Sequence, residues 1–269
     1  MNLLVVEMRR ALHRRVVWGL VGLAVALSAL AGVVAFLDSR DLNVVLLERT
    51  GETHAAVMEH WWISGGGDGI LPIAAIALLL GGLIGGASVA GAEWKAGTIT
   101  TVLTWEPRRG RLHAARTASA GLLAFVIAFG LQIVFLASFL PSVIAHGTTG
   151  DIDRAWWFAL VAAMGRIAAI TACSAVLGVA LATIGRSTAF AIVAAWLWLA
   201  VGEGIIRSLK PDWGRALLGE SSTTVLTWAR LDADHAVIGV WPSVALALAY
   251  VTVLTALGAI TFLRRDVAG

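Results

Sequence analysis

Six long apolar runs dominate the pattern of hydrophobic and polar positions along this chain. Each has about 20 residues and lacks the period-two alternation of a barrel strand, so the pattern predicts helices. At 1.5 Å per residue, each run is long enough to cross the roughly 30 Å hydrocarbon core of a bilayer. The predicted spans cover residues 16–37, 70–92, 118–140, 157–184, 188–206 and 241–263. We therefore predict an all-α membrane protein in which residues 1–269 form a single transmembrane domain.

The first fifteen residues predict a different kind of helix. Their apolar positions recur at helical spacing, and basic side chains occupy the positions between them. The apolar positions are Leu3, Leu4, Met8, Ala11 and Leu12. This pattern is typical of an amphipathic helix lying on a membrane surface, and we expect an interfacial helix over residues 1–15. The alternative is a plain positively charged flank for the first span.

Composition agrees with a membrane protein and excludes a soluble domain of this length. Of the 269 residues, 59% are hydrophobic and only 14% are charged, too few to cover a soluble surface. The single cysteine, Cys173, lies inside the fourth predicted span, so no disulfide can form within the chain.

Lysine and arginine are unevenly distributed between the predicted loops. If both termini face the cytoplasm, twelve basic residues fall in the inner segments and seven in the outer ones. Because basic residues favour the cytoplasmic side, this bias predicts that both termini are inside (N-in, C-in). The sequence pI near 9.7 then reflects topology and does not indicate binding to nucleic acid.

The loop between the second and third spans carries the most functional information. Gly97 interrupts the preceding helix, and Thr98 is placed to cap a new one. Ile99, Val102 and Leu103 then fall on a single helical face. A short helix held across the base of two membrane helices is a rigid lever, which a partner can push to tilt the spans. A capped turn with a basic flank is the alternative, and spacing alone does not decide between them.

Three features of the chain occur together in one family of membrane proteins. The N-terminal segment MNLLVVEMRRALHRR runs straight into the first span, six spans fill nearly the whole chain, and the stretch GASVAGAEWKAGTITTVLTWEPRR contains a Glu-aromatic-x-x-Gly-Thr pattern with Glu93 as its first residue. In these features the chain resembles the membrane subunit, or permease, of type-2 ATP-binding-cassette (ABC) transporters. The likeness covers about the full length, but its specific part is confined to residues 86–109.

The resemblance implies a permease that pairs with a second copy or a paralogue and docks a separate ATPase subunit. Closure of the ATPase pair would tilt the spans, so that the cavity between the permeases alternates in access. The expected direction is export, of lipophilic or amphipathic cargo, across a bacterial cytoplasmic membrane. The implied coupling residues are Glu93, Trp94, Lys95, Gly97, Thr98, Ile99, Val102, Leu103, Trp105, Glu106 and Arg108.

The lysines agree with an ATPase on another polypeptide. A P-loop needs glycine amides around the phosphates and a lysine followed by serine or threonine. Neither Lys95 nor Lys210 follows a glycine. We therefore expect this chain to bind no cofactor, with ATP and Mg²⁺ on the partner subunit, and we expect its other partners to be membrane lipids.

Four glycines in the second span form two overlapping small-xxx-small pairs. They are Gly81, Gly82, Gly85 and Gly86. Such pairs let another helix approach closely and predict a helix–helix contact. The alternative is that these glycines only reflect the frequency of glycine in membrane helices.

One arginine lies within a predicted span, where a lone charge is costly. Arg166 is about nine residues inside the outer end of the fourth span, roughly 14 Å deep. Glu203, near the outer end of the fifth span, is the nearest carboxylate in depth, and we predict an intramembrane charge pair between them. Two alternatives stay open: Arg166 lines a wet translocation cavity, or Glu203 pairs with Arg207 at i+4.

Other classes of membrane protein fit the pattern less well. An ion-coupled secondary transporter normally places carboxylates near the middle of the membrane, and the second, third and sixth spans contain none. An intramembrane enzyme lacks support, because no HExxH motif or aspartate pair lies within a span. His54 and His60 are six residues apart and do not share a helix face, so the pattern favours a solvated loop and we expect no metal site. A sensor or structural membrane protein is a further alternative, although it would not need a docking lever.

Overall fold

The computed structural model describes residues 3–41, 52–62, 69–228 and 239–264. These residues are almost entirely helical, and the described part contains an isolated bridge between Val57 and Thr148 but no β-strand. Within it, six helical stretches are long and apolar enough to cross a membrane, which confirms the predicted number of spans. They are Arg15–Asp38, Leu71–Lys95, Arg109–His146, Arg154–Gly185, Thr188–Leu209 and Val240–Arg264. The fold is that of a multi-pass helical membrane protein.

The N-terminal segment forms helix α1 (Leu3–Leu12), and α2 (Arg15–Asp38) follows after a break. Arg14 has extended backbone geometry, so the chain changes direction between α1 and α2. The buried residues of α1 are Glu7 and Ala11. A charged residue of α1 is therefore turned toward the protein, and the position of α1 on a membrane surface stays a prediction.

Helices α4 (Leu71–Lys95) and α8 (Arg154–Gly185) form the centre of the bundle. Half of the most apolar stretch of each helix is buried inside the protein, a larger share than in the other four spans. Pro72 lies in the first turn of α4, where its missing N–H is not needed for a helical hydrogen bond. Asp153 caps α8 by accepting a hydrogen bond from the Trp156 N–H at 2.7 Å.

The loop between α4 and α6 contains the predicted transverse helix. It is α5 (Ile99–Trp105), and α6 (Arg109–Ala137) begins after Pro107. Helix α6 starts nine residues before the predicted apolar span, because its basic first turns are also helical. A short turn leads from α6 into α7 (Leu140–His146).

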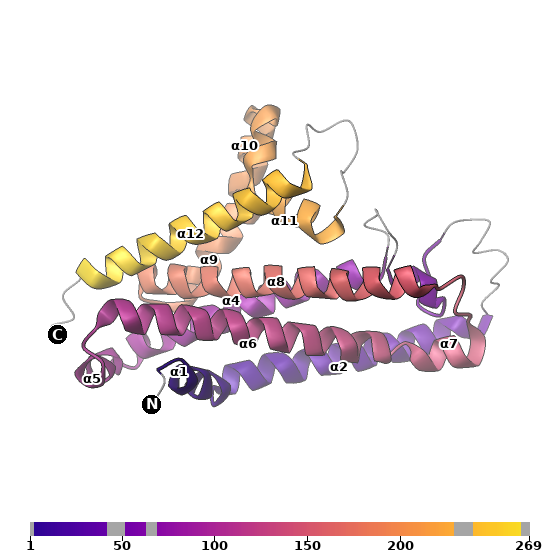
Figure 1. The fold of residues 1–269 in the computed structure, drawn as a ribbon, viewed down its shortest axis with the longest axis horizontal. Coiled ribbons are helices and arrows are strands. Elements are labelled where there is room, and N and C mark those ends of the chain that lie inside the picture. The colour runs from indigo at the N-terminus through magenta and orange to yellow at the C-terminus, as the bar shows by residue number, and fades with distance from the viewer. Residues whose placement is uncertain (1–2, 42–51, 63–68, 229–238, 265–269) are drawn as a thin grey trace.

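The fifth span is interrupted by a π-helical turn. It consists of α9 (Thr188–Leu197), the π turn η3 (Trp198–Gly202) and α10 (Glu203–Leu209). Figure 1 shows α10 rising away from the other helices. The remaining elements are the short helices η1 (Ser39–Asp41), η2 (Met58–Trp61), η4 (Pro211–Ala216) and α11 (Leu218–Thr227), and the last span α12 (Val240–Arg264).

The two ends of the bundle differ in what they carry. Figure 1 shows both chain termini and α5 gathered at one end, with α7 at the other. We call these the α5 end and the α7 end. Both termini lying together agrees with an even number of spans, whereas the side of the membrane that each end faces stays a prediction.

Candidate functional site

Glu93, the first residue of the ABC-like motif, is buried at the last turns of α4. The residue is 4% exposed, and its carboxylate contacts three guanidinium groups. Arg116 on α6 pairs with Oε2, while Arg10 Nη2 and Arg14 Nη2 lie 3.0 and 3.3 Å from Oε1. The side chain therefore joins α1, α4 and α6, and it does not itself offer an exposed docking surface.

Glu7 supplies a second buried carboxylate to the same group. Its Oε1 accepts a hydrogen bond from Arg10 Nη1 at 2.7 Å, and its Oε2 lies 3.6 Å from Arg116 Nε. Two carboxylates thus face three guanidinium groups, and we call these five residues the charge cluster: Glu7, Arg10, Arg14, Glu93 and Arg116.

Arg14 also fixes the position of the cluster on α4. Its Nη1 donates to the Ser88 carbonyl oxygen at 2.6 Å, and its Nη2 donates to the Val89 carbonyl oxygen at 3.0 Å. Burial lowers the pKa of the Arg14 guanidinium from its ordinary value, and the charge of Glu93 acts in the opposite direction. The sequence interpretation missed this role, although Glu7 and Arg10, at i and i+3, share one face of α1.

Helix α5 packs onto the bundle through the face that the sequence predicted. Ile99 is 4% exposed and lies in an apolar group with Leu112 of α6 and Phe262 of α12, against which Val102 and Leu103 pack. This contact fixes α5, which we call the crossbar, to the membrane helices α6 and α12. A displacement of α5 would therefore be passed on to both helices.

The residues before α5 turn the chain without the expected cap. Gly97 has φ +66°, a left-handed conformation that favours glycine. The Thr98 side chain occupies the N-cap position but makes no capping hydrogen bond. Trp94 packs edge-on against Phe262 at 6.3 Å between ring centroids, and the Arg186 guanidinium lies 5.0 Å from the Trp94 ring.

Exposed residues lie on both sides of α5 and along its outer face. Trp105 is 86% exposed, the largest value among the large hydrophobic residues of the described ranges. Lys95 and Arg108 are also exposed. Glu106 pairs weakly with Arg111 at 3.5 Å and accepts a hydrogen bond from the Arg108 N–H at 3.3 Å. An indole with no covering side chains beside basic residues has the character of a protein-binding surface.

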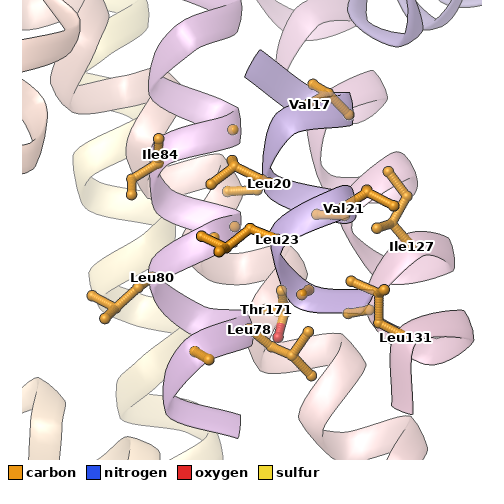
Figure 2. Close-up of a pocket in the computed structure, with 18 of the residues that line it drawn as sticks. Val17, Leu20, Val21, Leu23, Leu78, Leu80, Ile84, Ile127, Leu131 and Thr171 are labelled. Carbon is orange, nitrogen blue, oxygen red and sulfur yellow. The ribbon is translucent and has the colours of Figure 1, made fainter. Parts of the chain in front are cut away.

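A largely apolar cavity of about 520 Å³ lies between α2, α4 and α6 (Figure 2). The side chains labelled around it come from α2, α4, α6 and α8; Leu20 and Leu23 lie between α2 and α4, whereas Leu80 and Ile84 project from the other side of α4. They are Val17, Leu20, Val21, Leu23, Leu78, Leu80, Ile84, Ile127, Leu131 and Thr171. The volume is within the range of small-molecule sites.

One buried amide lies in the cavity wall. Gln132 is fully buried, and its Nε2 donates to the carbonyl oxygens of Ala128 and Met164 at 3.1 and 3.2 Å. Two carbonyl partners fix which side of the amide carries the nitrogen. Its Oε1 accepts no hydrogen bond from the residues that the structure describes.

The four glycines of α4 divide into two pairs. A Cβ on Gly82 would lie 2.7 Å from the Thr171 carbonyl oxygen of α8, and a Cβ on Gly86 would collide with the backbone of Ala175. A Cβ on Gly81 or Gly85 would meet nothing within 4 Å, and both glycines line the cavity. The first pair allows close helix packing, while the second leaves space open.

The structure does not bring Arg166 and Glu203 together, which corrects the expected intramembrane pair. The Arg166 guanidinium lies 5.3 Å from the Trp62 ring and 5.0 Å from the Trp228 ring, and no ion pair joins it to any residue in the described ranges. Similar depth in two spans did not imply contact, because α10 leaves the bundle (Figure 1). Of the two alternatives, the i+4 pair of Glu203 with Arg207 is also absent.

Glu203 has a different partner on another helix. It is 3% exposed, and its carboxylate accepts hydrogen bonds from the Gly219 N–H at 2.9 and 3.2 Å. Gly219 lies in the first turn of α11, where a negative charge is favourable. Arg207 pairs instead with Glu220, at 3.3 Å.

The chain matches no protein-family model, no curated protein and no solved structure. Six helices long and apolar enough to cross a membrane define the described residues as a multi-pass helical membrane protein.

Proposed function

We propose that this chain is the membrane-spanning permease subunit of an ATP-driven ABC exporter in a bacterial cytoplasmic membrane. The observation that carries the proposal is the crossbar α5, which has an ABC-like motif at its start and the 86% exposed Trp105 at its end. An ATPase subunit would bind this surface and hold ATP and Mg²⁺. A second permease copy or a paralogue would complete the pathway.

The contacts around α5 support a route for force into the bundle. Ile99 ties the crossbar to α6 and α12 through Leu112 and Phe262, and Glu93 ties the preceding helix to α1 and α6. A displacement of α5 would therefore act on several membrane helices together. In this proposal Glu93 holds the C-terminal end of α4, from which α5 follows, against α1 and α6. The exposed residues near Trp105 contact the ATPase subunit.

The apolar cavity supports a lipophilic or amphipathic cargo. Its walls are almost wholly aliphatic, and Gly81 and Gly85 keep it open on the α4 side. A ligand of low polarity would replace hydrocarbon or empty space there without losing hydrogen bonds. Closure of α2 onto α4 would expel it, as alternating access requires.

The experiment that tests the proposal is co-purification of the membrane-inserted chain with an ATPase. We expect a Walker-motif ATPase subunit to bind the chain, and its ATP hydrolysis to rise on addition of a lipophilic substrate. Cargo movement by this chain in vesicles that lack any ATPase would contradict the proposal.

An ion-coupled secondary transporter is the second candidate, favoured by Glu203. This buried carboxylate contacts a backbone N–H and no cation within the described residues, as a residue that exchanges a proton would. Transport by the isolated chain, driven by a proton gradient and lost in Glu203→Gln, would support this candidate. An unchanged rate in Glu203→Gln would exclude it.

A further inference from the structure

Arg166 is enclosed by aromatic rings from two different loops. Trp62 follows η2, and Trp228 is the C-terminal cap of α11, so the guanidinium on α8 lies between segments far apart in the sequence. Trp62 is 3% exposed and Trp228 is 40% exposed. One side of the enclosure is therefore buried, and the other is formed by a partly exposed side chain.

The positive charge of Arg166 has no compensating carboxylate within the described ranges. Acidic groups elsewhere in the described residues have other partners: Glu203 accepts from the Gly219 N–H, Glu220 pairs with Arg207, and Glu59 Oε2 accepts from the Asp151 N–H at 3.3 Å. Arg166 Nε is buried and has no hydrogen-bond acceptor. Two indole faces attract a cation, but they do not accept the guanidinium's in-plane hydrogen bonds.

The backbone holds Trp228 in place at a conformational cost. Its φ is +53°, a left-handed conformation that is unfavourable for a bulky side chain. Its ring packs edge-on against Trp241 of α12, with centroids 5.6 Å apart. The ring that covers Arg166 is thus supported from behind, and the enclosure is preformed.

We propose that Arg166, Trp62 and Trp228 form a binding site for an oxyanion, a carboxylate or a phosphate, carried by an amphipathic molecule. The oxyanion accepts hydrogen bonds from the in-plane N–H groups of the guanidinium. A guanidinium binds a carboxylate or a phosphate through two parallel hydrogen bonds. Arg166 lies twelve residues into α8, roughly 18 Å along the helix axis, so the ligand reaches it at membrane depth. An apolar tail on the ligand would provide that access.

This site is independent of the proposed export function, because binding can be measured on the chain alone. The probe is a dibrominated stearate, whose bromine atoms quench tryptophan fluorescence, titrated into the full chain in nanodiscs. Its uncharged methyl ester is the matched ligand. We expect Arg166→Gln to weaken binding of the carboxylate about tenfold, the effect of one lost charge-assisted hydrogen bond, and to leave binding of the ester unchanged.

Two further variants separate recognition from folding. Arg166→Lys keeps the charge without the planar fork, and we expect it to retain part of the preference for the carboxylate. Arg154→Gln is the matched control, because Arg154 is on the same helix and stacks on one ring, that of Phe158, at 5.6 Å. We expect Arg154→Gln to bind both ligands as the unaltered chain does.

The source of the oxyanion is tested by competition. Inorganic phosphate that displaces the brominated stearate indicates a site for free anions, whereas displacement by phosphatidic acid alone indicates a lipid headgroup. The proposal is overturned if Arg166→Gln binds the carboxylate with unaltered affinity, or if its affinity for the ester falls as much as its affinity for the carboxylate.

Discussion

Glu93 on α4 and Arg116 on α6 form a direct ion pair in which neither side chain is more than 5% exposed. Arg10 and Arg14 complete the shell around the same carboxylate, so the α5 end of the bundle is held by a shared negative charge. A buried pair is costly to form but more costly to break, because removal of one partner leaves the other charge without compensation.

Removal of the Glu93 charge should destabilise the protein. In Glu93→Gln, three guanidinium groups lose a common partner, and we expect a cost of about 3 kcal/mol in unfolding free energy. The thermal unfolding midpoint in detergent, followed by size-exclusion elution, measures the effect. Glu106→Gln is the control, because Glu106 makes two weak contacts among the described residues, with Arg111 at 3.5 Å and with the Arg108 N–H at 3.3 Å, and we expect it to change stability by less than about 0.5 kcal/mol. Equal stability of the two variants would contradict the role of the charge cluster.

Neighbouring glycines of α4 should respond oppositely to alanine. Gly86→Ala places a methyl group against the Ala175 backbone, so α4 and α8 must separate, and we expect a loss of about 2 kcal/mol. Gly85→Ala adds the same methyl group in open space, and the higher helix propensity of alanine should stabilise the protein by up to about 1 kcal/mol. Thermal unfolding of the two single variants provides the measurement. A larger loss in Gly85→Ala would show that the helix contact is assigned to the wrong face.

Trp105 should matter for partner binding and not for stability. It is 86% exposed, so Trp105→Ala removes few intramolecular contacts and should leave the unfolding midpoint unchanged. If an ATPase subunit docks on α5, we expect the variant to lose at least tenfold in affinity for it, as aromatic interface residues commonly do. Trp213→Ala is the control, because Trp213 is 61% exposed on a different loop. Co-purification of the ATPase with all three proteins in equal yield would argue against docking at Trp105.

The segment around His60 should lose stability as the pH falls. Burial lowers the pKa of His60 from its ordinary value of 6.5; the nearby Glu59 raises it and His54 lowers it further. Below pH 6.5 the unfolded chain therefore binds protons more readily than the folded one, so stability falls as pH drops through that value and levels off below the folded pKa. Its Nδ1 also accepts a hydrogen bond from the His54 N–H at 3.1 Å, which protonation of that nitrogen would break.

Unfolding midpoints between about pH 8 and pH 5 test this effect. We expect the midpoint of His60→Gln to depend less on pH than that of the unaltered chain. The exposed His13 serves as the control, and His13→Gln should keep the full pH dependence. Identical slopes for His60→Gln and the unaltered chain would exclude His60 as the cause.

The sequence predicted the features that depend on local pattern. Apolar length determined the six spans, and the i, i+3, i+4 spacing of Ile99, Val102 and Leu103 identified both α5 and its buried face. These features follow from the period of the helix and the thickness of the membrane, neither of which requires knowledge of distant contacts.

The sequence did not predict which distant residues meet. Similar depth in the membrane predicted a pair between Arg166 and Glu203. The fifth span instead diverges from the bundle, and the Arg166 guanidinium contacts two indole rings, from Trp62 and Trp228. Likewise, the motif placed Glu93 at a docking surface, whereas its partners Arg10 and Arg14 lie about eighty residues earlier in the chain. Spacing along one helix carries no information about the angle between helices, which packing of whole side chains decides.

The glycine contact between α4 and α8 also limits how these two helices can move relative to each other. A Cβ on Gly178 of α8 would collide with the Leu83 carbonyl oxygen of α4, so the two backbones interlock from both sides. Helices in such contact cannot slide or rotate separately without breaking it. We therefore expect α4 and α8 to move as one unit in any conformational change, whereas α10, which leaves the bundle, is not held by such a contact.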